Sequence, residues 1–388
     1  MTRSLRILYI ALFLGLLLAL GIWSLTAFGN FNRTEQMTLL NGKWAKAVET
    51  HYDDEFPIKR LGTNIWAALD FKVFNEGRPG VILGKDQWLY TDEEFDPVAN
   101  SEQIEAENFA LIRGVRDQLK QHGVQLVMAI VPAKARLYPE HIGAQTPASL
   151  HADLYQQFHA QAQQAGIVAP DLLAPLQQAK QQGQVFLRTD THWTPMGAEV
   201  VAQNLSKTIA AQMPLNGTPQ QYQTAAVKTE PYKGDLTTFL PLDPLFSNLL
   251  PKPDDLQQRA TTVVNSSADS SSDAGDAALF ANNDIPVALV GTSYSANPHW
   301  NFLGALQQSL KSDVVNYAED GHGPILPMLK YLQTDAFKNS PPQVLIWEFP
   351  ERYLPMKNDL SEFDPKWVAN LKKSSDTNNQ NLAVGQSN

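Results

Sequence analysis

Hydrophobic residues in this chain form one long uncharged run near the N-terminus and then shorter, periodic groups. Residues 7–28 carry no charged side chain, and a helix of that length spans roughly 33 Å, enough to cross a hydrocarbon core of about 30 Å. Arg3 and Arg6 precede the run, so the positive-inside rule keeps the N-terminus in the cytoplasm. Residues 24–28 offer no clean small-x-small cleavage site, which favours an uncleaved anchor over a signal peptide. We therefore expect a cell inner membrane protein whose folded body lies in the periplasm.

Beyond residue 97, helical and strand-like patterns alternate. Residues 100–123 carry apolar side chains at helical spacings, and residues 124–131 are almost uniformly apolar, as in a strand buried on both faces. Thr194 and Pro195 are typical of a helix N-terminus. The remaining pattern predicts a hairpin at 81–90, helices at 151–164, from 195 and from 298, and strands at 167–169, 185–187, 285–290, 313–317 and 344–347. This alternation predicts an α/β fold, a parallel sheet with helices on both faces and an active site at the carboxyl ends of its strands.

The same pattern divides the chain into four parts. Residues 1–30 form the membrane anchor, and residues 31–97 a membrane-proximal lead-in packed on the core. Residues 98–372 form the α/β domain, with an insertion at about 214–284 that is rich in proline, glutamine and serine. The polar residues 373–388 are expected to be disordered.

Charge and cysteine content exclude two classes of function. The net charge is −10 and the basic residues are scattered, whereas proteins that bind nucleic acids concentrate them in a stripe or patch. The chain contains no cysteine, so thiol catalysis and thiolate metal sites are excluded.

The segment Asp190-Thr191-His192 carries the first candidate chemistry. In an extended segment, residues two apart point to the same side, so the carboxylate can orient the imidazole while His192 takes and returns a proton near neutral pH. The alternatives are a chance pairing, or a histidine that only caps the helix that follows.

A serine follows the strand predicted at 285–290. Gly291-Thr292-Ser293-Tyr294-Ser295 leads from that strand into a helix, which exposes a hydroxyl beside backbone N–H groups, as an acyl-transfer nucleophile requires. Ser293 is the predicted nucleophile. Thr292 and Ser295 are its rivals, and a helix cap is the alternative role.

Together, Ser293, His192 and Asp190 each follow a strand of one predicted sheet. We expect His192 to deprotonate Ser293, which then forms an acyl-enzyme. His299 and His322 are alternative bases. We expect no metal, because no His-x-x-x-His pair is present and the Asp-x-His pair lacks an obvious third ligand.

With these motifs in place, the chain resembles the SGNH-type polysaccharide O-acetyltransferases, and most closely the J-type branch of periplasmic alginate O-acetyltransferases. The resemblance extends from the N-terminal anchor through residues 83–90 (LGKDQWLY), 131–134 (VPAK), 190–193 (DTHW), 291–295 (GTSYS) and 347–353 (WEFPERY). It implies a flavodoxin-like SGNH hydrolase fold with Ser293, His192 and Asp190 as the triad. It also implies acetylation of mannuronate hydroxyls of alginate, with no cofactor. The implied partners are a membrane-bound O-acyltransferase that supplies acetyl groups and the other alginate acetylation and export proteins.

The chain departs from the wider SGNH pattern in two ways. Those hydrolases place Asp-x-x-His after the serine, whereas here Asp-x-His precedes it by about 100 residues, so the catalytic motifs are circularly permuted. The usual oxyanion-hole asparagine also has no clear equivalent. The candidate donors are the N–H of Ser293, the N–H of Gly321 and the side chain of Asn297.

Three cations are candidates for contacts with uronate carboxylates. Lys134, Arg136 and Arg352 lie at or just after predicted strand ends, and arginine can bind a carboxylate with two hydrogen bonds. Ordinary salt bridges to Glu348, Glu351 or other acids are the alternative.

Two other functions are compatible with the same residues. An acetylesterase would use the same acyl-enzyme, with water in place of the sugar hydroxyl. A non-catalytic scaffold of the acetylation and export complex would need only the anchor and the insertion.

Overall fold

The computed structural model describes residues 3–29, 31, 42–264 and 286–373, and the chain forms two compact units. The smaller unit runs up to Pro79 and takes in Thr238–Leu250, and the larger unit comprises Gly80–Thr237 and the chain from Pro251. The division therefore falls after Pro79 instead of at residue 97. Residues 80–97 belong to the larger unit, where the Leu89 N–H donates to the Arg188 carbonyl oxygen (3.0 Å).

The smaller unit is helical. The uncharged run forms a helix that is long and apolar enough to cross a membrane. No residue in its most apolar 18-residue stretch is buried within the described structure. The Asn64 amide donates to the Pro241 carbonyl oxygen (2.6 Å) and so attaches the returning segment 238–250 to the third helix. The elements are α1 (Arg3–Ser24), η1 (Leu25–Phe28), α2 (Lys43–Glu55), α3 (Pro57–Leu69), a π-helical turn η2 (Asp70–Phe74) and η6 (Ser247–Leu249).

A four-stranded parallel sheet forms the centre of the larger unit. Its order is β3-β8-β6-β7, with Val287 of β6 opposite both Val344 of β8 and Val314 of β7. The interior strands carry apolar side chains on both faces because helices cover both, and every residue of β8 is buried. The strands are β3 (Gln125–Val131), β6 (Val287–Val290), β7 (Val314–Asn316) and β8 (Val344–Pro350).

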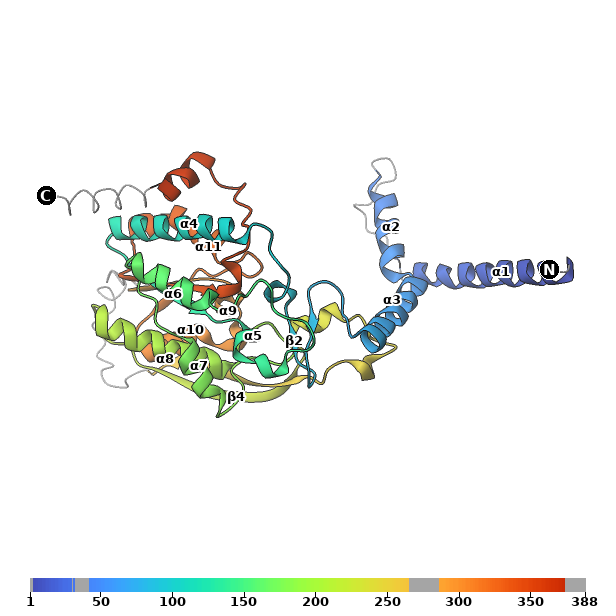
Figure 1. The fold of residues 1–388 in the computed structure, drawn as a ribbon, viewed down its shortest axis with the longest axis horizontal. Coiled ribbons are helices and arrows are strands. Elements are labelled where there is room, and N and C mark those ends of the chain that lie inside the picture. Colours follow the sequence, from blue (N-terminus) through green and yellow to red (C-terminus); the bar gives the residue numbers. More distant parts are fainter. Residues whose placement is uncertain (1–2, 30, 32–41, 265–285, 374–388) are drawn as a thin grey trace, which may run out of the picture. The chain divides into compact units, whose positions relative to one another are not determined.

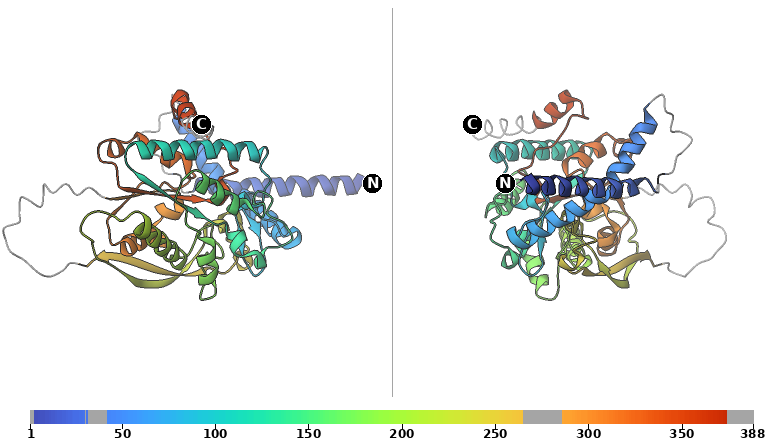
Figure 2. Two further views of the ribbon diagram at one scale, coloured as in Figure 1. Left: turned by 60° about the vertical axis from the view of Figure 1, so that its left-hand side comes forward. Right: turned by 90° about the vertical axis from the view of Figure 1, so that its right-hand side faces the viewer.

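Helices α4 and α11 lie on one face of this sheet, and α8 and α10 lie on the other (Figures 1 and 2). Thr194 caps α8 as predicted, since its hydroxyl accepts the Gly197 N–H (3.1 Å). The helices are α4 (Ser101–Gln121), α5 (Lys134–Leu137), α6 (Leu154–Gln164), α7 (Leu173–Lys180), α8 (Pro195–Gln212), α9 (Ser293–Ala296), α10 (Phe302–Leu310), α11 (Ile325–Gln333) and α12 (Asp335–Asn339). The 3₁₀ turns are η3 (Asp92–Glu94), η4 (Pro139–His141), η5 (Asp235–Phe239), η7 (Pro298–Trp300) and η8 (Glu351–Tyr353).

Two antiparallel hairpins complete the larger unit. The predicted hairpin at 81–90 is present as β1 (Ile82–Leu83) and β2 (Leu89–Tyr90). The insertion contains an unpredicted pair of long strands, β4 (Tyr222–Tyr232) and β5 (Asp254–Val263), with Tyr222 opposite Val263. The serine-rich part of the insertion and the polar C-terminal tail lie outside the described residues.

Two predicted strands are wrong. Residues 167–169 contribute only a parallel bridge between Val127 and Val168, and residues 185–187 only an antiparallel bridge between Phe186 and Trp193. The chain turns back on itself at this second point, because the Thr194 N–H donates to the Val185 carbonyl oxygen (2.9 Å). The Asp-x-His motif therefore lies in a closed loop and not at the end of a sheet strand.

Gly114 of α4 tests how the C-terminal segment packs on the fold. A Cβ atom at Gly114 would lie 2.0 Å from the Leu371 carbonyl oxygen, whereas one at Gly62 of α3 would meet nothing within 4 Å. Gly114→Ala should lower the thermal midpoint of the larger unit by about 5 °C because the helix ending at residue 373 must move. Gly62→Ala should leave the midpoint unchanged or raise it, since alanine favours helix. Thermal unfolding in detergent measures both, and an unchanged midpoint for Gly114→Ala would contradict this packing.

Candidate active site

The turn after β6 presents the hydroxyl of Ser293. Thr292 is the N-cap residue of the short helix α9, and its side chain accepts the Tyr294 N–H. Thr292 and Ser295 are buried, and both hydroxyls contact the Glu348 carboxylate, whereas Ser293 is partly exposed. Of the three hydroxyls that the sequence offered as nucleophiles, only Ser293 is therefore directed to a candidate base.

Ser293, His192 and Asp190 form a hydrogen-bonded chain. His192 Nε2 lies 2.6 Å from Ser293 Oγ, and His192 Nδ1 lies 2.7 Å from Asp190 Oδ1. An ionised carboxylate can only accept, so Nδ1 carries the proton and Nε2 is free to accept the serine hydroxyl. The ring of Trp300 stacks on the imidazole, with centroids 5.1 Å apart and an interplanar angle of 22°. The imidazole is thus fixed in position and tautomer.

Asp190 is fully buried, and donors surround its carboxylate. Oδ1 accepts the backbone N–H of His192 (2.8 Å) as well as its ring, and Oδ2 accepts the Asp235 N–H (2.9 Å) and the Tyr232 hydroxyl (3.2 Å). Burial alone would favour the neutral acid, but the hydrogen bonds and the nearby imidazole outweigh it and lower the pKa of Asp190 to about 2. The acceptance of an N–H two residues ahead makes the motif a turn, which replaces the predicted extended segment.

Lys134 holds the loop that carries Asp190. Its side chain is buried, and its ammonium group donates to the carbonyl oxygens of Leu89 (2.6 Å), Arg188 (3.0 Å) and Asp190 (2.8 Å). Burial lowers its pKa to about 8, and the ammonium lies over the Trp88 ring, 5.2 Å from the ring centroid. A single cation therefore joins β2 to the Asp-x-His loop.

Glu348 of β8 accepts hydrogen bonds from the turn that carries Ser293. This fully buried carboxylate accepts the Thr292 N–H (2.7 Å) and the Ser295 hydroxyl (3.1 Å). Burial raises its pKa, and the hydrogen bonds act against that rise. A Cβ atom at Gly291 would lie 2.4 Å from Glu348, so glycine allows the turn to approach it. In the sequence, Glu348 stands out only as an acidic residue within an otherwise apolar strand, which does not indicate what its carboxylate contacts.

Tyr294 connects the serine turn to the histidine loop. Its hydroxyl donates to the Thr191 carbonyl oxygen (2.7 Å) and accepts from Arg352 Nη1 (3.0 Å). Arg352 is itself buried and donates to Glu93 (2.8 Å). The residues beside Ser293 and His192 are thus bonded to each other, independently of the contact between those two side chains.

These contacts count against the predicted substrate-binding role of the three cations. Lys134 and Arg352 are 1% and 3% exposed, and their donors already have partners within the protein. Arg136 forms a two-pronged pair with Glu351, through Nε (2.8 Å) and Nη2 (3.0 Å). The salt bridges that the sequence left open are present for Arg136, with Glu351, and for Arg352, with Glu93, whereas Lys134 donates to backbone carbonyl oxygens instead.

Asp235 is a second carboxylate at the site that the sequence reasoning missed. It accepts the Thr191 N–H (2.8 Å), and its Oδ2 lies 3.7 Å from His192 Nδ1. Burial and the charge of Asp190 raise the pKa of Asp235. Asp190, His192 and Asp235 could in principle ligate a metal, but Asp190 and His192 Nδ1 already hydrogen-bond within the loop. The absence of a metal remains a prediction.

A protein-family model for an SGNH hydrolase-like domain, acetyltransferase AlgX, matches residues 81–351. The chain belongs to this family of acetyltransferases. The match contains Asp190, His192 and Ser293 and the residues that support them, except Arg352, which lies one residue beyond its end.

Close relatives cover nearly the whole chain. A probable alginate O-acetylase AlgJ from Pseudomonas syringae pv. tomato is 75% identical over 384 residues, which is 99% of this chain and 97% of the relative. A protein of the same name from Pseudomonas putida is 71% identical over 384 residues, covering 99% and 98%.

Solved structures agree with the family. The O-acetyltransferase domain of Pseudomonas putida AlgJ matches with a TM-score of 0.70 and 68% identity, covering 76% of this chain and 100% of that chain. Pseudomonas aeruginosa AlgX matches with a TM-score of 0.52 and 25% identity, covering 71% and 63%. The predicted SGNH hydrolase fold is thus confirmed, and the protein is an enzyme of the O-acetyltransferase class.

The predicted oxyanion donors Asn297 and Gly321 lie in two different turns of this acetyltransferase. Asn297 caps the turn η7, because its Oδ1 accepts the His299 N–H (3.0 Å). Gly321 lies on an exposed turn, two residues after Glu319, whose N–H donates to the Gly291 carbonyl oxygen (3.2 Å). The Gly321 turn therefore starts beside the serine turn. The N–H groups of Ser293 and Gly321 and the side-chain N–H of Asn297 all remain predicted donors.

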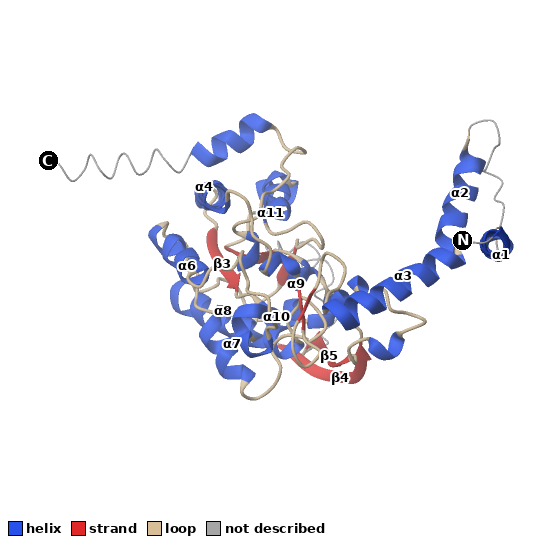
Figure 3. Cartoon of the chain, turned by 45° about the vertical axis from the view of Figure 1, so that its right-hand side comes forward, coloured by secondary structure: helices blue, strands red, loops and turns tan. Residues whose placement is uncertain are grey.

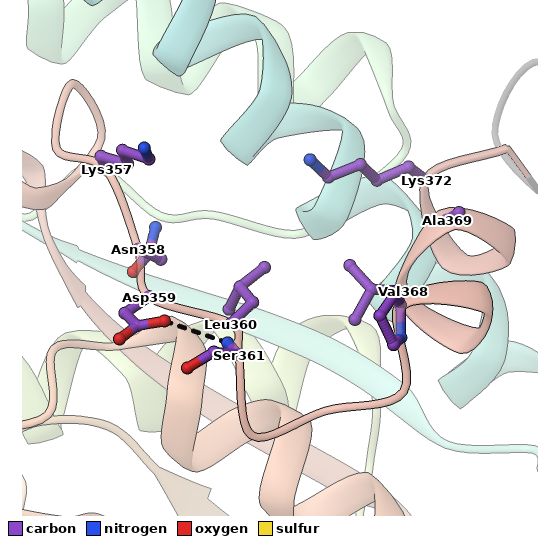
Figure 4. Close-up of a pocket in the computed structure, with 9 residues that line it drawn as sticks. Lys357, Asn358, Asp359, Leu360, Ser361, Val368, Ala369 and Lys372 are labelled. Carbon is purple, nitrogen blue, oxygen red and sulfur yellow. Dashed lines mark hydrogen bonds between the residues drawn. The ribbon is translucent and has the colours of Figure 1, made fainter.

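A separate groove in the acetyltransferase is lined by residues 357–372, near the end of the described chain. Figure 4 shows it between the segment 357–361 and the helix that ends at residue 373, with Lys357 and Lys372 at its two sides. Its lining includes none of the residues of the candidate site.

Replacing Lys134 tests the support of the Asp-x-His loop. Lys134→Met should cost about 2 to 4 kcal/mol of stability, because three carbonyl oxygens lose their donor, and lower the rate of acyl transfer about tenfold by displacing Asp190. Lys180→Met is the matched control, since Lys180 is partly exposed and should cost under about 1 kcal/mol. Denaturant unfolding and ester turnover measure these effects. Equal losses in the two variants would contradict the role of Lys134.

The low pKa of Asp190 predicts how stability depends on pH. The pKa of about 2 is below the ordinary value of about 3.9, so the ionised carboxylate stabilises the fold above about pH 4, by up to about 2 to 3 kcal/mol. That stabilisation is lost as the pH falls toward 2. The difference in thermal midpoint between the wild type and Asp190→Asn should therefore narrow between pH 5 and about pH 3. Asp235→Asn is the control with the opposite sign, because a raised pKa gives a contribution that is lost as the pH rises. The same trend in both variants would contradict the assignment.

Proposed function

We propose that this acetyltransferase moves acetyl groups onto mannuronate hydroxyls of alginate, through an acetyl-enzyme formed on Ser293. The observation that carries the mechanism is the continuous hydrogen-bonded chain from Ser293 Oγ through His192 to Asp190. The names of relatives more than 70% identical over nearly the full chain support the substrate.

The first half-reaction forms the acetyl-enzyme. Ser293 Oγ attacks the acetyl carbonyl carbon while its proton passes to His192 Nε2. The tetrahedral intermediate collapses, the bond from the acetyl carbon to the donor's leaving group breaks, and His192 gives its proton to that group. Asp190 keeps Nδ1–H oriented and stabilises the imidazolium.

The second half-reaction reverses these roles. A sugar hydroxyl gives its proton to His192 and attacks acetyl-Ser293, after which the serine oxygen leaves and recovers the proton. The N–H groups of Ser293 and Gly321 are the proposed oxyanion donors in both halves, because negative charge develops on the carbonyl oxygen beside the serine turn.

We propose a periplasmic location for this chemistry. Helix α1 would cross the inner membrane with the N-terminus in the cytoplasm, as Arg3 and Arg6 favour. Acetyl groups would then come from a membrane-bound O-acyltransferase partner, and the acceptor from the other alginate acetylation and export proteins. Because the chain carries a net charge of −10, long-range attraction cannot guide a polyanion, and contact with the polymer should be short and local.

Two neighbouring serines allow a matched test of the nucleophile. Ser293→Ala should lower the turnover of a chromogenic acetate ester by at least about 10⁴-fold, because no acetyl-enzyme forms. Ser295→Ala should retain most activity, since its hydroxyl faces Glu348 (3.1 Å). Full turnover by Ser293→Ala would show that the nucleophile is another residue.

Transfer and hydrolysis are separated by supplying an acceptor. With a mannuronate oligomer present, the wild type should form acetylated oligomer at the expense of free acetate, and Ser293→Ala should form neither. Acetate release with no transfer would identify an acetylesterase instead. Polymer that stays fully acetylated in cells carrying Asp190→Asn, His192→Ala or Ser293→Ala would indicate a scaffold.

A further inference from the structure

Helix α3 and the turn η2 display a stripe of large apolar side chains. Ile65, Leu69 and Val73 recur every four residues, and Trp66 and Phe74 extend the same surface. Their exposed fractions are 51%, 39%, 64%, 63% and 57% in that order, so the described residues leave more than a third of each side chain uncovered. Within the smaller unit, Trp66 lines a pocket with Phe239, Leu240 and Pro241, and the other four side chains of the stripe are not part of that lining.

Charge around the stripe differs from that of the whole chain. Residues 57–79 contain four basic residues (Lys59, Arg60, Lys72 and Arg78) against two acidic ones (Asp70 and Glu76), a net charge of +2, whereas the chain carries −10. An apolar face flanked by basic residues is the pattern of a helix that lies on an anionic lipid surface.

The stripe belongs to the unit that contains the candidate membrane span. Helix α1 contacts α3, and the end of the apolar run packs on α2 through Phe28 and Tyr52, whose rings stack at 5.0 Å. Phe56 continues this cluster, 5.2 Å from Tyr52. Aromatic side chains at the end of a span are typical of the membrane–water interface.

The direction of the helices fits the same location. Figure 3 looks almost along α1, while α2 and α3 run across the view. If α1 stands across the bilayer, α2 and α3 run along its surface. A helix in that orientation can immerse one side in the headgroup region along its whole length.

From these four observations we propose that the stripe of Ile65, Trp66, Leu69, Val73 and Phe74 binds the periplasmic surface of the phospholipid bilayer in which α1 is anchored. The proposal rests on the membrane anchoring proposed for α1 and adds a second, peripheral attachment to it. Apolar side chains enter the headgroup region, and Lys59 and Lys72 contact anionic lipid phosphates, whereas Arg60, nine residues before Leu69, lies on the opposite side of the helix.

The absence of cysteine in the chain makes a site-directed spin-label test direct. Single cysteines are placed at Ile65 and Val73 in the stripe and at Arg60, an exposed residue of the same helix outside the stripe. Ile10, 55% exposed in α1, is the reference for the anchor. The full chain is reconstituted into vesicles of phosphatidylethanolamine and phosphatidylglycerol, and chromogenic ester turnover confirms that each variant is folded.

Accessibility to oxygen, which concentrates in the bilayer, is compared with accessibility to a neutral nickel chelate, which stays in water. The Ile65→Cys and Val73→Cys labels should show an oxygen-to-nickel accessibility ratio several-fold above that of the Arg60→Cys label. This ratio should fall when the protein is moved from the vesicles into soluble peptidiscs. Equal ratios at all three sites would overturn the proposal. So would stripe labels shielded from both reagents, which would mean that another part of the chain or a protein covers the stripe. A water-exposed Ile10→Cys label would instead show that α1 is not an anchor.

Discussion

The buried carboxylate of Asp190 is the feature on which the rest of the site depends. An ionised carboxylate without solvent is costly unless its oxygens are saturated by donors, and here the donors come from three places. His192 contributes two, Tyr232 one from the end of β4, and Asp235 one from the turn that follows. Meeting this demand folds the Asp-x-His segment into a turn, fixes the imidazole tautomer and draws the β4–β5 excursion against the α/β core. The insertion is therefore part of the site's construction.

Buried charges attach the two halves of the site to the fold. On the histidine side, Lys134 supplies three hydrogen bonds to carbonyl oxygens of β2 and of the loop. On the serine side, Glu348 receives the turn that follows β6. Tyr294 then joins one side to the other. Such buried charged groups add little net stability to the fold. Each of them has its hydrogen bonds satisfied in only a few arrangements, so the distance between Ser293 and His192 follows from the positions of the supporting strands.

This construction also explains how circularly permuted motifs reach the same geometry. The histidine loop precedes the serine in the chain by about 100 residues and does not belong to the sheet. Because it is held by side chains and not by a strand register, its place in the chain order is free to differ from that of other SGNH hydrolases. The smaller unit stands apart from this scheme, since it contains the candidate membrane span and none of the site residues described above.

Elements with strong local patterns could be predicted from the amino-acid sequence alone. The uncharged run, the helix at 100–123, the strands at 124–131 and 344–347, and the helix start at Thr194 depend on periodicity and capping, which are properties of neighbouring residues. The pairing of Ser293 with His192 could also be predicted, because a serine before a helix and an Asp-x-His pair each have a recognisable local form. Contacts between residues distant in the chain could be identified only once the fold was known. Asp235, Tyr232, Glu348 and Tyr294 carry no local signal of their roles, and Lys134 and Arg352 resemble surface cations until their burial is known. The strand predicted at 185–187 failed for the same reason: an apolar segment can satisfy its backbone by folding back on itself as well as by joining a sheet, and only the surrounding structure selects between the two.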